Sequence, residues 1–214
     1  MMEFSAVVLA GGASRRMGLD KRFLSVGGQP LVAWVIDRLR PLVGEVVLVS
    51  STPEAFNDWD VRITTDQYAG QGVLAGVHAG LAAARGAWAY VMAADLPLLN
   101  PALLAAMGVL AGQCTADVIV PQWHGELEPL HALYRPAVCA PAAEQALLRG
   151  ERRIVSFYPN VRVEIMPEAD VARWDPSGAS FFNVNTLEDW RSALLQLGFP
   201  PEPISLSGQP VNDA

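Results

Sequence analysis

The stretch that decides the fold runs from residue 6 to residue 21 and reads Ala6-Val7-Val8-Leu9-Ala10-Gly11-Gly12-Ala13-Ser14-Arg15-Arg16-Met17-Gly18-Leu19-Asp20-Lys21. An apolar run enters a pair of glycines, and a short basic loop follows that ends in a lysine. This order predicts a buried strand whose end exposes backbone N–H groups beside several cations. Phosphate groups bind well at such a place, because amide donors and positive charge converge there at little steric cost. The stretch therefore predicts a site for a nucleotide or another phosphorylated ligand.

Two common phosphate-binding motifs do not fit this stretch. A P-loop requires Gly-x-x-x-x-Gly-Lys-Ser/Thr, whereas here the interval from Gly12 to Gly18 is longer and Leu19 follows. A dinucleotide fingerprint requires Gly-x-Gly-x-x-Gly, and the order that begins at Gly11 does not supply it. A glycine-rich turn with solvated arginines is the alternative, but turn geometry alone does not explain two arginines and a lysine beside three glycines.

Length and composition limit the class of protein. The 214 residues are enough for one large α/β domain or, alternatively, for two small ones. Hydrophobic residues make up 51% of the chain, which predicts a sizeable core. No apolar stretch reaches the ~18 residues that span a bilayer, and the N-terminus has no signal-peptide pattern. Because Cys114 and Cys139 are the only cysteines, we expect a reducing, cytoplasmic location.

The charge distribution indicates the kind of ligand. The net charge of −7 argues against nucleic acid as a partner. Arg15, Arg16 and Lys21 nevertheless lie within seven residues. Local basicity in an acidic protein indicates a small anionic ligand rather than a polyanion.

Strand-like and helix-like segments alternate along the chain. This alternation predicts an α/β protein with a three-layer, doubly wound, mostly parallel sheet. Asn100 and Thr186 are expected to cap the helices that follow them. Apolar, β-rich runs predict strands over 4–9, 45–50, 61–65, 87–93, 116–121, 130–134 and 161–165, and helical spacing predicts helices over 31–42, 76–84, 101–111, 141–148 and 189–197.

Ligands of open α/β sheets bind beyond the carboxyl ends of the strands, which shortens the list of candidate metal ligands. Asp95 follows an apolar predicted strand, and Pro97 stops that strand. A carboxylate there can hold Mg²⁺, which prefers oxygen ligands and bridges to substrate phosphates; the alternative is a turn-forming or capping aspartate. Asn183 and Asn185 lie two apart in an extended segment, so both face the same way and can offer further oxygens. Their alternative role is an Asn-rich turn before the last helix.

Asp66 is a candidate for contact with the base or the ribose of a nucleotide. It follows the third predicted strand and precedes Gly70, Gly72, Gly76 and Gly80. These glycines allow the backbone to approach a flat ring closely. An aspartate also accepts hydrogen bonds from the N1–H and the exocyclic amine of guanine, an edge that adenine and cytosine do not present.

A second group of candidates lies in the later half of the chain. Glu128 opens the segment that ends at His131, and Arg152 and Arg153 follow a glycine. The arginines are candidates to neutralise a phosphate on a second substrate, or else they form a solvated helix end. His131 and His124 invite a catalytic interpretation, but a lone histidine is more often a structural residue.

The string Leu-Ala-Gly-Gly-x-Ser-Arg-Arg-Met-Gly-x-Asp-Lys resembles the N-terminal loop of nucleotidyltransferases that activate sugars and cofactors. Its Leu-Ala-Gly-Gly form is most similar to the molybdenum cofactor guanylyltransferases. The resemblance covers residues 5 to about 195 and includes Asp-x-Pro after the fourth predicted strand and Phe-Asn-Val-Asn-Thr-x-Glu-Asp near the end. Two positions depart from the family pattern: Val73 stands where proline is usual, and Ser50 stands where asparagine is often found.

The resemblance implies a Rossmann-like nucleotidyltransferase domain, which we place at residues 1–198. Residues 199–214, rich in proline and glycine, are expected to form a flexible C-terminal tail. The implied reaction is transfer of GMP from Mg-GTP to molybdopterin or the molybdenum cofactor, with release of pyrophosphate. Transient contact with proteins that deliver the cofactor, or with molybdoenzymes, is also expected.

The resemblance also implies roles for individual residues. Because both reactants are anionic, neutralisation of charge and positioning dominate, and the attacking phosphate needs no general base. The predicted catalytic residues are Lys21, Arg15 and Asp95, and the predicted Mg²⁺ ligands are Asp95, Asn183 and Asn185. The predicted nucleotide-binding residues are Leu9, Ala10, Gly11, Gly12, Lys21, Asp66, Gly76 and Asp95, and those for the second substrate are Arg152, Arg153 and Glu128.

Three other functions stay open. A cytidylyltransferase acting on the same cofactor is the nearest, but such relatives tend to carry Leu-Ala-Ala-Gly, and Gly11 argues against it. A sugar-phosphate nucleotidyltransferase usually has an extra domain, for which this chain lacks room. A non-catalytic nucleotide-binding module would not need Lys21, Asp95 and Asn185 together.

Overall fold

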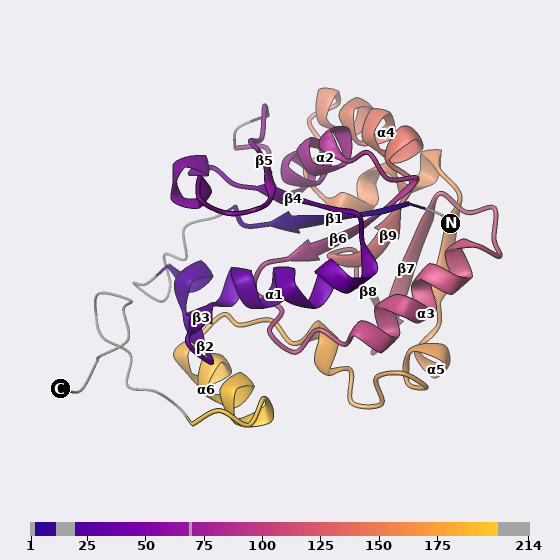
Figure 1. The fold of residues 1–214 in the computed structure, drawn as a ribbon. Helices are drawn as coiled ribbons and strands as arrows, with labels where there is room; N and C mark the ends of the chain where they lie inside the picture. Colours follow the sequence, from indigo (N-terminus) through magenta and orange to yellow (C-terminus); the bar gives the residue numbers. More distant parts are fainter. Residues whose placement is uncertain (1–2, 12–19, 69, 201–214) are drawn as a thin grey trace.

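A computed structural model describes residues 3–11, 20–68 and 70–200 (Figure 1). Its main sheet is mixed but mostly parallel, and a separate two-stranded hairpin precedes the first helix. The strands of the main sheet are β1 (Phe4–Leu9), β4 (Glu45–Val49), β5 (Arg62–Thr64), β6 (Trp88–Ala93), β7 (Val118–Trp123), β8 (Glu126–Leu127), β9 (His131–Tyr134) and β10 (Val163–Met166), and the hairpin is β2 (Ser25–Val26) with β3 (Gln29–Pro30).

The strand order in the main sheet is β10-β7-β9-β6-β1-β4-β5, with β8 paired to β7. Strand β1 pairs in parallel with both β4 and β6, so it lies in the middle of the sheet. Strand β9 runs antiparallel to both of its neighbours, β6 and β7. The expected doubly wound, mostly parallel α/β sheet is therefore confirmed, while the reversed direction of β9 is a feature that the sequence pattern does not reveal.

Helices cover both faces of the sheet, so the domain has three layers with the sheet in the middle (Figure 1). One face carries α1, α3 and α6, and the other carries α2 and α4. The longer helices are α1 (Leu31–Leu39), α2 (Val73–Ala83), α3 (Pro101–Ala111), α4 (Pro136–Leu148) and α6 (Leu187–Gln196); the short ones are α5 (Glu168–Val171) and the 3₁₀ turns η1 (Lys21–Phe23), η2 (Arg40–Leu42), η3 (Pro53–Phe56), η4 (Ile154–Asn160) and η5 (Ala179–Phe181).

The core consists of two apolar clusters, one on each face of the sheet. In β1, Ala6 and Val8 belong to the cluster under α1 and α3, whereas Val7 belongs to the cluster under α2 and α4. Successive side chains of a strand point to opposite faces, which explains the alternation. Because both faces are covered, the strand is apolar throughout, as in other parallel sheets.

Local signals predict several helix ends correctly. The Asn100 side chain accepts a hydrogen bond from the Ala102 N–H at 2.9 Å and caps α3. Thr186 and Asp189 form a reciprocal capping box at the start of α6.

The prediction that a helix begins at Pro141 is wrong, because α4 begins at Pro136 and Pro141 lies inside it. Pro136 fits the first turn of α4, because the missing N–H of proline is not needed there.

Helix α2 lies very close to β1, and glycine makes this possible. A Cβ atom at Gly80 would lie 2.2 Å from Val7 Cγ1 and 3.0 Å from Val49 Cγ2. Gly80 therefore serves the packing of helix on sheet and not the approach to a flat ring. One turn earlier, a Cβ at Gly76 would meet Leu9 at 3.7 Å, an ordinary contact.

The end of the described chain packs against the domain. The ring of Phe199 lies edge-on to Trp34 with 5.7 Å between the centroids. Residues 201–214, most of the predicted tail, lie outside the described residues, so the domain boundary stays a prediction. Within the described ranges, no helix combines the length and the apolar character that crossing a bilayer requires.

Candidate active site

The carboxyl ends of β1, β4, β5 and β6 meet at one edge of the sheet. Backbone hydrogen bonds join the segments that leave these strands: the Ala10 N–H donates to the Val49 carbonyl at 2.9 Å, and the Ala94 N–H donates to the Leu9 carbonyl at 3.1 Å. The Val184 N–H donates to the Asp95 carbonyl at 3.0 Å and brings the Asn183–Asn185 segment to the same edge. Predicted residues that are far apart in the sequence thus border one region.

A cavity of about 180 Å³ opens at this edge. The residues of its wall include six of those predicted to bind the nucleotide or the metal: Leu9, Ala10, Gly11, Lys21, Asp95 and Asn183. Of the remaining predictions, Gly12 and Arg15 lie outside the described residues, and Asp66, Gly76 and Asn185 do not line the cavity.

Lys21 and Asp95 form an ion pair in the wall of this cavity. The Lys21 ammonium also donates a hydrogen bond to the Val184 carbonyl at 3.3 Å. The two side chains are 22% and 15% exposed, so the pair is shielded but open to a ligand. Lys21 is the only lysine of the whole chain, in which the other 14 of the 15 basic Lys and Arg residues are arginines.

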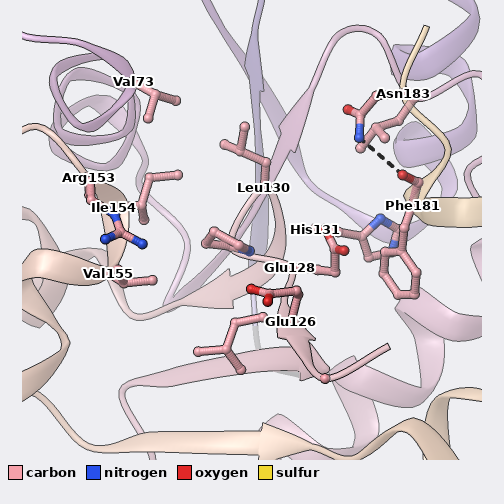
Figure 2. A pocket seen from close by; sticks show the side chains of 14 residues that line it. Val73, Glu126, Glu128, Leu130, His131, Arg153, Ile154, Val155, Phe181 and Asn183 are labelled. Atoms are coloured by element: carbon pink, nitrogen blue, oxygen red, sulfur yellow. Dashed lines mark hydrogen bonds between the residues drawn. The ribbon is translucent and has the colours of Figure 1, made fainter. Parts of the chain in front are cut away.

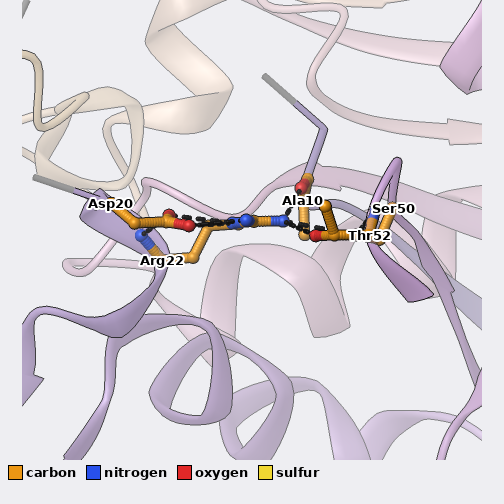
Figure 3. A network of polar contacts seen from close by, with 5 residues as sticks. All are labelled: Ala10, Asp20, Arg22, Ser50 and Thr52. Carbon is orange, nitrogen blue, oxygen red and sulfur yellow. Dashed lines mark hydrogen bonds and ion pairs between the residues drawn. The ribbon is translucent and has the colours of Figure 1, made fainter. Parts of the chain in front are cut away.

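Arg22, which is not among the residues predicted from the sequence, holds together three segments beside this cavity (Figure 3). Its Nη1 donates to the Ala10 carbonyl at 3.0 Å and to Thr52 Oγ1 at 3.0 Å. Its Nε donates to Asp20 Oδ1 at 2.8 Å, and this hydrogen bond holds the pKa of Asp20 below its usual value. The Asp-x-Arg spacing beside Lys21 is the only signal in the sequence that pointed to the network.

Ser50, which departs from the family pattern, belongs to the same network. Its hydroxyl oxygen accepts from Arg22 Nη1 at 3.3 Å and from the Thr52 N–H at 3.1 Å. Ser50 is 1% exposed. This serine therefore supports Arg22 and is not placed to contact a base or a ribose.

Asp66 follows β5 and is half-buried. Its Oδ1 accepts from the Tyr68 N–H at 2.6 Å, which closes a turn at the end of the strand. Its own loop thus gives the carboxylate a hydrogen-bond partner at the end of β5.

Asn183 and Asn185 flank Val184, which is buried. The Asn183 amide donates to the Phe181 carbonyl at 3.1 Å. The backbone N–H of Asn185 donates to Asp189 Oδ2 at 2.9 Å and joins the capping of α6. Both residues are exposed, and of the two only Asn183 lines the cavity.

A second cavity of about 520 Å³ adjoins the first and shares Val73, Leu130 and Asn183 with it. Figure 2 shows Arg153 on one side of this cavity and Glu126 and Glu128 on the other. Burial, with the nearby Glu126 charge, raises the pKa of Glu128 to about 7. The cavity thus contains a carboxyl group that changes charge near neutral pH.

The remaining candidates divide between this cavity and the surface. Burial lowers the pKa of His131 to about 4, and the neutral ring lies edge-on to Phe181 at 5.0 Å. His124 is exposed beside Glu168. Arg152 is exposed, and its carbonyl accepts from the Leu74 N–H at 3.4 Å, which places it at the start of α2 rather than in the cavity wall.

The donor set fits a hard cation that is shared with a substrate. Among the described residues, no three His, Cys, Asp or Glu side chains gather to form a self-sufficient metal site. Asp95 and the Asn183 amide offer oxygen atoms at the cavity wall. Mg²⁺ is commonly held by one or two carboxylates, with waters and substrate phosphates completing its shell.

Comparison with known proteins identifies the family. The MobA-like NTP transferase domain matches residues 6–163. The probable molybdenum cofactor guanylyltransferase of Natranaerobius thermophilus is 34% identical over 198 residues, which cover 91% of this chain and 96% of that protein. The molybdenum cofactor guanylyltransferase of Syntrophotalea carbinolica is 32% identical over 198 residues, covering 91% and 94%. The crystal structure of molybdopterin-guanine dinucleotide biosynthesis protein A from Archaeoglobus fulgidus superposes with a TM-score of 0.79 at 28% identity, covering 91% of this chain and 98% of that one. The chain belongs to the MobA-like NTP transferases, in the family of the molybdenum cofactor guanylyltransferases.

Proposed function

We propose that this protein transfers GMP from Mg-GTP to the terminal phosphate of molybdopterin or the molybdenum cofactor, which yields the guanine dinucleotide cofactor and pyrophosphate. The observation that carries the proposal is the pair of adjoining cavities that share Val73, Leu130 and Asn183. The smaller cavity, with Lys21 and Asp95, takes the triphosphate. The larger one takes the second substrate, so the two reacting phosphates meet between them.

The reaction is an in-line displacement at the α-phosphorus of GTP. An oxygen of the second substrate's phosphate forms the new bond to the α-phosphorus, and the bond from that phosphorus to the β-bridging oxygen breaks as pyrophosphate leaves. Both reactants are anionic, so positioning and charge neutralisation lower the barrier. The Lys21 ammonium is held at the cavity wall by Asp95 and the Val184 carbonyl. There it neutralises triphosphate oxygens, and Arg15 serves the same purpose in this proposal.

The Mg²⁺ ion is assigned to Asp95 with help from Asn183 and Asn185. The oxygen atoms of these side chains suit the ion, and Asp95 and Asn183 border the triphosphate cavity. When bound, Mg²⁺ neutralises charge on the triphosphate. No general base is needed, because the attacking phosphate monoester is already ionised near neutral pH, and the neutral, buried His131 fits a structural role.

The nucleoside is assigned to the residues that follow β1 and β5. Leu9, Ala10 and Gly11 border the smaller cavity and, together with Gly12, hold the phosphates and ribose in this proposal. Asp66 accepts from the guanine edge, since its carboxylate is oriented by its own turn with the Tyr68 N–H. Gly76 keeps the first turns of α2 narrow beside Leu9.

The second substrate is assigned to the larger cavity. Arg153 in its wall, with the exposed Arg152 nearby, attracts the substrate's phosphate. Glu128, on the other side, is placed to bind polar hydrogen atoms of the pterin ring.

Location and partners are part of the same proposal. Cys114 and Cys139 are both free, which suits a reducing cytoplasm. Because the cofactor must arrive and leave, transient contact with delivering proteins or with molybdoenzymes is proposed as well. We also propose that residues 1–198 form the nucleotidyltransferase domain and that residues 199–214 form a C-terminal tail.

Pyrophosphate release with each of the four nucleoside triphosphates, with and without molybdopterin, tests this function. Release with GTP alone and only in the presence of molybdopterin is the expected result. Release with CTP instead identifies a cytidylyltransferase. Absence of release with any pair overturns the catalytic assignment and favours a nucleotide-binding module.

A further inference from the structure

The Arg22 guanidinium, in the wall of the smaller cavity, joins three segments of the chain. Ala10 precedes the basic stretch of residues 12–19, Asp20 follows it, and Thr52 lies in the segment that leaves β4. Arg22 donates to Ala10 O at 3.0 Å, to Asp20 Oδ1 at 2.8 Å and to Thr52 Oγ1 at 3.0 Å. One side chain therefore ties together Ala10, Asp20 and Thr52, which lie in three separate segments (Figure 3).

The guanidinium is already engaged by the protein, so Arg22 is not primarily a ligand for the substrate. Its hydrogen bonds to Asp20, Ala10 and Thr52 use most of the five N–H groups of the side chain. The side chain is 11% exposed. The guanidinium carbon Cζ lies 5.5 Å from the ring centroid of Phe23 and 5.6 Å from that of Phe56. Charge-assisted, geometrically fixed contacts of this kind hold a side chain in a single conformation.

Lys21 lies between two members of this network in the sequence. The Asp20 carboxylate accepts hydrogen bonds from the Arg22 backbone N–H, Nε and Nη2, so the backbone at Lys21 is fixed from both sides. The lysine side chain is long and flexible, and it directs a cation well only when its backbone is fixed. From this backbone the ammonium reaches Asp95 and the Val184 carbonyl.

We propose that Arg22 is a positioning residue: it clamps Ala10, Asp20 and Thr52 together and thereby places the Lys21 ammonium at the phosphate-binding edge of the cavity. Its effect on turnover rests on the proposed function. Its effect on Lys21 does not, since that is a property of the free protein.

The first test follows Lys21 directly and needs no substrate. Because Lys21 is the only lysine, ¹⁵N-lysine labels a single backbone amide and a single ammonium group for NMR. We expect Arg22→Met to shift or broaden both signals, and Thr52→Val, which removes one 3.0 Å contact, to shift them less. Arg40→Met is the matched control, because Arg40 pairs with Asp60 near the opposite end of β4. Unchanged Lys21 signals in folded Arg22→Met overturn the proposal.

The second test is a double-mutant cycle on pyrophosphate release. We expect Arg22→Met to lower kcat/KM for GTP about a hundredfold, the effect of misplacing a reacting group by about 1 Å. In a Lys21→Ala background the same substitution has little further effect, because its target is gone. Losses that multiply in the double variant contradict action through Lys21, and Arg22→Lys, which keeps the charge, is expected to recover part of the activity. If the wild-type protein releases no pyrophosphate, the proposed function fails, and the NMR comparison still decides the role of Arg22.

Discussion

The Lys21 ammonium lies against the Asp95 carboxylate, although 74 positions separate the two residues in the sequence. Lys21 belongs to the turn η1 after the basic stretch, and Asp95 follows the end of β6. The pair places a cation beside a group that is suited to hold Mg²⁺, inside the wall of the smaller cavity. Both charges are therefore present at the cavity before an anionic substrate binds, which lowers the cost of reorganisation during the reaction.

Replacement of Lys21 by alanine is expected to lower turnover with GTP about a hundredfold to a thousandfold, the usual effect of removing a group that stabilises developing charge. The fold should stay intact, because Lys21 is partly exposed and its ion pair with Asp95 is shielded only in part. Initial rates of pyrophosphate release, with thermal melting as the folding check, measure the effect. Arg40→Ala, which removes an exposed cation elsewhere, serves as the control. Guanylyl transfer near the wild-type rate would falsify the role of Lys21.

Replacement of Asp95 by asparagine is expected to raise the Mg²⁺ concentration needed for half-maximal activity. The substitution keeps the size of the side chain but removes the one carboxylate among the described residues that line the cavity. A titration of activity with Mg²⁺ at saturating GTP measures the shift. Asp60→Asn, at a fully exposed carboxylate, should leave the titration unchanged. Coincident curves for Asp95→Asn and the wild type exclude Asp95 as the metal ligand.

Glu128 is expected to make stability depend on pH between about 4.5 and 7. Burial raises the pKa of this carboxyl to about 7 from its ordinary value of 4.5, so in this window the folded protein holds a proton that the unfolded chain has released. Stability therefore falls as the pH rises through the window, because the unfolded state binds fewer protons there. The melting temperature of the wild type should fall relative to that of Glu128→Gln over this range. Parallel melting curves against pH for the two proteins contradict the assignment.

The neighbouring Glu126 gives a control for the same prediction. Its negative charge contributes to the raised pKa of Glu128. Glu126→Gln removes this charge while Glu128 is kept, so the pH-dependent step in stability should move to lower pH. If the pH-dependent change in stability stays at the same pH in Glu126→Gln, the charge of Glu126 does not influence the pKa of Glu128.

Two glycines of α2 should respond to alanine in opposite ways. At Gly80 the new Cβ would lie 2.2 Å from Val7 Cγ1, so Gly80→Ala is expected to lower the free energy of unfolding by about 1–3 kcal/mol through overpacking. At Gly76 the nearest atom is Leu9 Cδ2 at 3.7 Å, so Gly76→Ala should raise it by about 0.5–1 kcal/mol through helix propensity. Urea denaturation of both variants measures the difference.

Gly76→Ala also tests a predicted nucleotide contact. A fall in GTP affinity without loss of stability supports Gly76 as part of the nucleotide site. Unchanged GTP binding shows that Gly76 serves only the packing of α2 beside Leu9.

The local sequence determined most elements of the fold. Apolar runs predicted the central strands β1, β4 and β6, and the Asn100 and Thr186 caps predicted the starts of α3 and α6. These signals are local, since period, cap and breaker act within a few residues. The local signals failed at Pro141, because a proline can begin a helix or lie within one, and in the structure Pro141 lies inside α4.

By itself the sequence also determined that Asp95 follows the end of a parallel strand and that Lys21 closes the loop after β1, because strand ends can be read from the chain. Only the tertiary structure decided the rest: the reversed β9, the two adjoining cavities, the clamp made by Arg22 and the raised pKa of Glu128. The physical reason is that each of these depends on distances between segments far apart in the chain. Hydrogen bonds, burial and charge–charge contacts across such distances exist only once the sheet and its covering helices have packed together.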